Sequence, residues 1–96
     1  MTNPTAGRKL TRSEVGHAVD LERVFQDIKH GVIEQHGHTI GEWILIMESE
    51  LAEAKAALIK GGAGRDSVLQ EILQTVATGV ACLEQHGLDE IKGRSV

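Results

Sequence analysis

Aromatic side chains are almost absent from this sequence. The chain of 96 residues has one tryptophan, one phenylalanine and no tyrosine. Its core must therefore come from leucine, isoleucine, valine and alanine, which favours packing between helices. A single domain of this length buries only about 60–65% of the surface of its unfolded chain, so its own core gives it little stability. The composition predicts a small all-α protein that gains from a second chain.

Proline and cysteine are equally scarce. Pro4 is the only proline, so no proline interrupts a helix from Leu10 onward. Cys82 is the only cysteine, which excludes a disulfide within the chain. Because proteins without disulfides suit a reducing compartment, we expect a cytoplasmic location.

Positive charge and long apolar runs are also missing. The formal net charge is -4, and the basic residues are scattered, with no run longer than Arg8-Lys9. A nucleic-acid-binding domain needs a basic patch, so we expect no DNA or RNA partner. The longest apolar run, residues 43–47, is far too short to span a membrane, and residues 1–10 do not resemble a signal peptide. We therefore expect no membrane partner.

Three capping-box patterns mark predicted helix starts. In each, a Ser or Thr precedes a Glu or Gln by three residues, so that the two side chains can satisfy each other's backbone amides. The pairs are Thr11 with Glu14, Thr39 with Glu42, and Ser67 with Gln70. Each pair opens a stretch with apolar residues at helical spacing.

Glycines mark the predicted helix ends. The tetrapeptide Glu-Gln-His-Gly occurs at 34–37 and again at 84–87, which places Gly37 and Gly87 where a left-handed residue closes a helix. The run at 61–64 breaks the chain between two helices. We predict a flexible tail over 1–10 and a single domain over 11–96, with helices at 12–36, 40–60 and 67–86 and a short helical piece at 88–92.

The apolar pattern predicts self-association. The first predicted helix has a thin apolar stripe, made by Val15, Val19, Val24, Ile28 and Val32. The other two are apolar on more than one face, and a helix of that kind is buried on more than one face. Because one short chain cannot cover all of this surface, we predict an antiparallel bundle of three main helices that is completed by a homodimer or homotetramer.

Carboxylates form a polar line within the apolar helices. Glu50 and Glu53 are three residues apart and share one helix face, and Glu71 begins a similar line with Gln74 in the next helix. Carboxylates that share a partly buried site need protons or a cation, and oxygen ligands suit Mg²⁺ or Mn²⁺. A solvated acidic face is the alternative, but Glu50 and Glu53 have alanine, not a basic residue, four positions on.

The stretch from Trp43 to Leu58, followed by Glu71-Ile-Leu-Gln74-Thr-Val-Ala, resembles MazG-like nucleotide pyrophosphohydrolases. The resemblance covers about residues 20–87. That family has Glu-Glu-x-x-Glu on one helix and Glu-x-x-Asp on the next. Glu50 and Glu53 match the second and third glutamates of the first motif, and Glu71 matches the glutamate of the second. Ser49 and Gln74 depart from the pattern, each standing where a carboxylate is expected.

The resemblance implies a Mg²⁺-dependent enzyme, with Mn²⁺ as a substitute, that cleaves a nucleoside triphosphate to a monophosphate and pyrophosphate. It implies Glu50, Glu53 and Glu71 as catalytic residues, which bind the metal together with Gln74, and an assembly of two or more chains. Because Ser49 and Gln74 remove two carboxylates, two alternatives stay open. One is a catalytically impaired module that binds metal and nucleotide, and the other is a purely structural helical oligomer.

Two histidines and the tryptophan lie near the start of the second predicted helix. His36 and His38 could contact a phosphate, and Trp43 could stack on a base. The alternative is that the histidines interact with a helix C-terminus and the tryptophan packs in the core. We favour the second interpretation.

Overall fold

The computed structural model describes residues 8–60 and 64–88, and all the regular secondary structure in them is helical. Its elements are four helices: α1 (Arg12–His30), α2 (Ile33–His36), α3 (Ile40–Lys60) and α4 (Gly64–His86). No strand occurs in these residues. The prediction of an all-α fold is therefore confirmed.

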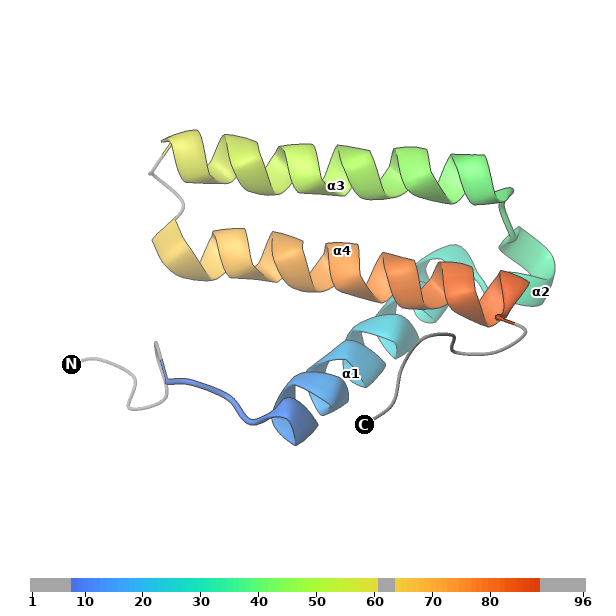
Figure 1. Cartoon of the computed structure of the whole chain (residues 1–96), viewed down its shortest axis with the longest axis horizontal. Helices are drawn as coiled ribbons and strands as arrows, with labels where there is room; N and C mark the ends of the chain where they lie inside the picture. Colours follow the sequence, from blue (N-terminus) through green and yellow to red (C-terminus); the bar gives the residue numbers. More distant parts are fainter. Residues whose placement is uncertain (1–7, 61–63, 89–96) are drawn as a thin grey trace.

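The two longest helices form an antiparallel hairpin that organises the rest of the chain. Figure 1 shows α3 and α4 side by side over their whole length. Helix α1 lies below α4 in this view and is inclined to it. The buried apolar residues are few and mostly small: Val19, Trp43, Ala54, Ala77 and Ala81. Alanines at the contact allow the helix axes to approach closely, but they bury little apolar surface.

Two of the three predicted capping boxes are present. Thr11 accepts a hydrogen bond from the backbone N–H of Glu14, and the Glu14 carboxylate accepts one from the Thr11 amide in return. Thr39 and Glu42 make the same reciprocal pair, at 3.1 and 2.8 Å, and α3 has the predicted bounds. The third box is wrong, because α4 begins at Gly64 and Ser67 lies inside the helix.

Gly31 ends α1 six residues before the predicted stop at Gly37. Its φ of 91° leaves the helical region, and its N–H donates to the carbonyl of Asp27 at 2.8 Å. The single turn of α2 follows, and the ring of His36 folds back over Gly31. Gly37 is extended, with φ of -71°, whereas Gly87 does adopt the predicted left-handed conformation, with φ of 71°.

A side-chain network fixes the connection between α2 and α3 against the end of α4. The amide oxygen of Gln85 accepts from Trp43 Nε1 at 2.8 Å and from the His38 backbone N–H at 2.9 Å. Its nitrogen donates to the His38 carbonyl at 2.6 Å. Trp43 is only 7% exposed, so it packs in the core as the favoured interpretation required.

The chain ends fall mostly outside the described residues. In the predicted tail, residues 8–10 are not helical, and residues 1–7 lie outside the described residues. In the predicted short helix at 88–92, Leu88 is not helical, and residues 89–92 lie outside the described residues. No helix in the described part is long and apolar enough to cross a membrane.

Glycine-to-alanine substitutions test the break between α1 and α2. In Gly31→Ala the new methyl group would overlap the His36 ring and the backbone would keep an unfavourable positive φ, so we expect a loss of roughly 1–3 kcal/mol of stability. Gly16→Ala is the matched control: it lies inside α1 with open space around it, so we expect a gain of about 0.5–1 kcal/mol. Urea denaturation of both variants measures this, and a stable Gly31→Ala protein would show that α1 continues through the break.

Candidate functional site

Glu50 lies on the flank of α3 that faces α1 and α4. Its side chain is partly buried, and its Oε1 has no hydrogen-bond partner. Burial raises the pKa of the Glu50 carboxyl, and the negative charges of Glu53, Glu71 and Glu22 raise it further, while the Thr78 hydroxyl partly offsets the shift. A carboxylate in this position lacks a compensating cation.

Glu71, from the facing helix α4, lies in an environment similar to that of Glu50. Its Oε2 is buried without a partner, although the residue as a whole is only partly buried. Desolvation raises the pKa of Glu71, and the nearby carboxylate of Glu53 raises it further. Glu53 itself is exposed. The structure thus brings the three predicted glutamates into mutual electrostatic contact across the α3–α4 hairpin.

A fourth carboxylate, Glu22 of α1, was not predicted from the sequence. Its charge acts on Glu50, and its Oε1 accepts a long hydrogen bond of 3.5 Å from Gln70 of α4. The signal was available: Glu22 follows the buried Val19 by three residues and precedes Gln26 by four, so all three share one face of α1.

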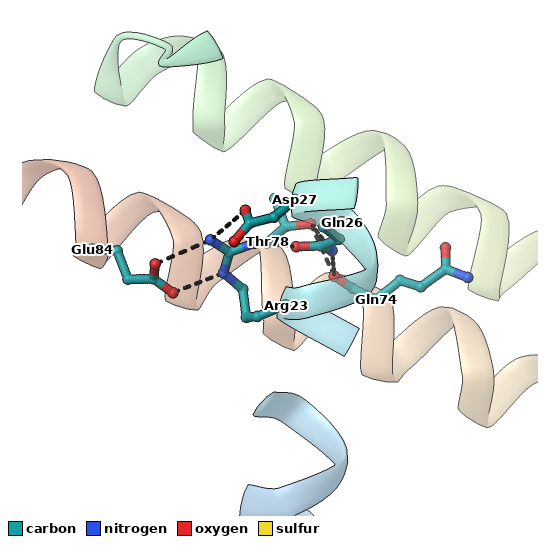
Figure 2. Close-up of polar contacts among 6 residues, drawn as sticks. All are labelled: Arg23, Gln26, Asp27, Gln74, Thr78 and Glu84. Atoms are coloured by element: carbon teal, nitrogen blue, oxygen red, sulfur yellow. Dashed lines mark hydrogen bonds and ion pairs between the residues drawn. The ribbon is translucent and has the colours of Figure 1, made fainter. Parts of the chain in front are cut away.

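Arg23 anchors α1 to α4 next to this cluster (Figure 2). The guanidinium is buried and forms a two-pronged ion pair with Glu84 of α4, at 2.8 and 3.0 Å, and a third contact with Asp27 at 3.1 Å. The hydrogen bonds and charge of Arg23 lower the pKa of Glu84. Arg23 also donates to Gln26, so its polar hydrogens are largely committed to partners within the chain.

Gln26 and Thr78 link this ion pair to the carboxylates. Gln26 Nε2 lies 3.4 Å from the Thr78 hydroxyl and 3.5 Å from the Gln74 carbonyl, which also accepts from that hydroxyl at 2.9 Å. Thr78 is 4% exposed, and its hydroxyl acts to lower the pKa of Glu50. Arg23, Gln26 and Thr78 therefore form a continuous polar path from the α1–α4 ion pair to Glu50.

The two positions that depart from the family pattern behave differently. Ser49 is exposed on α3. Gln74 joins the network through its backbone carbonyl, and Figure 2 shows its side-chain amide directed away from Arg23 and Thr78.

A cleft of about 690 Å³ opens beside Glu50. It is bounded by α1, the segment from Gly31 to His38, α3 and α4, and its polar lining includes Gln26, Asp27, His36, Glu50 and Thr78. Arg23 is the only lysine or arginine among the residues that line it, and that charge is already neutralised by Glu84 and Asp27. An anionic ligand in this cleft would meet uncompensated negative charge.

The carboxylate oxygens of this cluster suit a divalent cation chemically, but their positions do not form a complete binding site. The two orphaned oxygens, on Glu50 and Glu71, are hard ligands of the kind that Mg²⁺ and Mn²⁺ prefer. As their side chains are placed, no three His, Cys, Asp or Glu residues within 8–60 and 64–88 converge closely enough to hold a metal ion.

Comparison of the chain with models of known protein families, with curated proteins and with solved structures finds no match. The resemblance to MazG-like enzymes thus depends on the motif residues themselves, and the geometry of these residues carries the functional argument.

Neutralising Glu50 tests the electrostatic account. A carboxyl whose pKa is raised by folding destabilises the fold as the pH rises from about 4.5 through the raised pKa, because the folded state must then release a proton that the unfolded state has already lost. We expect Glu50→Gln to stabilise the protein by about 1 kcal/mol at pH 7.5 without divalent cations, and to have no effect at pH 4. Thermal denaturation at both values measures this.

The control for that experiment is Glu48→Gln, on the exposed side of the same helix, which should leave the melting temperature unchanged at either pH. Added Mn²⁺ should stabilise the unmodified protein but not Glu50→Gln. A Glu50→Gln protein that is less stable than the unmodified protein at pH 7.5 would contradict the account.

Proposed function

We propose that the protein is a metal-dependent nucleoside triphosphate pyrophosphohydrolase, which converts a triphosphate and water to a monophosphate and pyrophosphate. The observation that carries the proposal is the pair of buried, partnerless carboxylate oxygens on Glu50 and Glu71, from two facing helices, with Glu53 and Glu22 within electrostatic reach. An uncompensated cluster of this kind destabilises a fold, so its presence favours a functional role.

The charge of the site explains why a cation is needed. The cleft and its surroundings are acidic, and the only Arg or Lys in the lining is already paired. A triphosphate cannot approach such a site unless a cation lies between the two negative partners. When bound, Mg²⁺ or Mn²⁺ would neutralise phosphate oxygens and lower the pKa of a coordinated water. Glu50, Glu53 and Glu71 are the residues that would hold it.

The cleft beside Glu50 would receive the nucleoside. Its volume of about 690 Å³ is within the range of small-molecule sites. Ile46 contributes an apolar wall, and the Gln26 amide is held in the lining by its hydrogen bonds to Arg23 and Thr78. In the proposed reaction a water oxygen bonds to the α-phosphorus while the bond from this atom to the α–β bridging oxygen breaks.

A binding module that does not cleave nucleotide is the second candidate. The specific observation in its favour is that Ser49 is exposed on α3, while Gln74 carries no charge, so neither supplies a missing carboxylate. Such a module would use the same residues to bind metal and nucleotide but would release no pyrophosphate.

We also propose that the protein works as a homodimer or homotetramer in the cytoplasm. In the described part of the chain, few apolar residues are buried and none of the large side chains is fully buried, whereas many large apolar side chains are more than two-fifths exposed along α1, α3 and α4. Exposed apolar surface on this scale marks an association site. The single cysteine suits a reducing compartment.

A pyrophosphate-release assay tests the enzymatic proposal. With Mg²⁺ or Mn²⁺ and a panel of ribo- and deoxyribonucleoside triphosphates, we expect monophosphate and pyrophosphate in equal amounts. Glu50→Gln and Glu71→Gln should each lower turnover by at least about a hundredfold, because each removes a ligand charge. Glu48→Gln should retain full activity. Nucleotide-induced stabilisation without product would instead favour the binding module, and neither effect with any nucleotide would refute both.

A further inference from the structure

Helix α1 turns its polar face toward the chain's own core and its apolar face away from that core. The inner face carries Glu22, Arg23 and Gln26 around the single buried valine, Val19. Of the predicted apolar stripe on this helix, only Val19 is buried, whereas Val15, Val24, Ile28 and Val32 are exposed. The residues that the structure turns inward are mainly polar.

The outer face of α1, by contrast, is a compact apolar patch. Leu21, Val24, Phe25 and Ile28 follow the i, i+3, i+4, i+7 spacing of one helix face, opposite Val19. They are 57%, 55%, 61% and 79% exposed, and they include the only phenylalanine of the chain. We call these four residues the outer patch. A helix with this pattern normally turns such a face toward a partner.

From this reversal we infer that the outer patch is the interface with a second copy of the chain, in which the two α1 helices pack against each other across a two-fold axis. This inference rests on the self-association proposed above and is independent of the proposed enzymatic activity. It assigns opposite roles to the two faces of α1: the polar face lines the cleft, and the apolar face holds the dimer together.

The size of the patch is close to what a dimer needs. Four side chains exposed to this extent present on the order of 450 Å² of apolar surface, within the range at which a patch marks an interaction site. Two copies bring roughly 900 Å² to one interface before its polar rim is counted, and a specific interface needs about 1,000 Å².

A second copy also meets the requirement that the small core imposes. Few apolar residues of the described part are buried, and a second copy of the chain is a partner that is present wherever the chain is made. Two-fold association uses the same patch on both copies and closes on itself. Docking of the outer patch into the apolar groove between α3 and α4, near Leu51, Leu58 and Ile72, would be head-to-tail and would continue into open chains or rings.

Cross-linking of a single cysteine separates these arrangements. In a Cys82→Ser background, Val24→Cys places a thiol at the centre of the outer patch, where two-fold packing brings the same residue of both copies together. We expect a short bis-maleimide to join most chains into covalent dimers, and sedimentation to show a dimer beforehand. Ala56→Cys, on the exposed side of α3, is the matched control and should remain uncross-linked.

A substitution within the patch gives the second measurement. Ile28→Glu should raise the dimer dissociation constant at least about tenfold, whereas Leu58→Glu in the α3–α4 groove should leave it unchanged. If Ile28→Glu fails to fold, the cross-linking experiment still shows whether the outer patch is the dimer interface. A dimer that Val24→Cys does not cross-link would overturn the inference but leave self-association standing, and a helical monomer at micromolar concentration would overturn both.

Discussion

The ion pair between Arg23 and Glu84 is the constraint on which the arrangement of this protein depends. It fixes α1 across α4 through two hydrogen bonds of 2.8 and 3.0 Å, at a contact where apolar burial is slight. A buried guanidinium without a carboxylate is costly, so α1 has few other orientations available to it. The surface pair of Arg8 and Glu14, by contrast, lies in solvent and fixes little.

This anchoring determines where the remaining polar groups lie. With Arg23 turned toward α4, Glu22 and Gln26 on the same face of α1 are carried toward Glu50 and Thr78. Glu22 thus comes within electrostatic reach of Glu50, which lines the cleft, while Leu21, Val24, Phe25 and Ile28 are carried to the outside. One orientation of one helix thus accounts for both the acidic site and the uncovered apolar patch.

The parts of this arrangement that local chemistry decides could be predicted from the sequence. The reciprocal pair of Thr39 and Glu42 sets the start of α3 by itself, and the three-residue spacing of Glu50 and Glu53 places both on one flank of α3. The break at Gly31 was missed because it depends on the ring of His36 packing where a side chain would otherwise lie, which is a contact that helix periodicity does not encode.

The orientation of α1 could not be predicted either, because it also depends on a contact between residues that are distant in the sequence. Its spaced valines suggest an inward apolar stripe, and the choice of the opposite face depends on Glu84, 61 residues further along the chain. Glu22 and Arg23 therefore entered the site only with the structure. The predicted carboxylates Glu50 and Glu71 came from helices whose own apolar pattern fixes their packing, so their convergence could be anticipated.

Paramagnetic broadening by Mn²⁺ in NMR spectra of the labelled protein shows whether carboxylates from facing helices form one divalent-cation site. At substoichiometric Mn²⁺ the account predicts selective loss of the amide signals around Glu50 and Glu71, and no such loss in Glu50→Gln. Broadening that instead spreads over scattered surface acids such as Asp20 and Glu34, and that persists in Glu50→Gln, would contradict it.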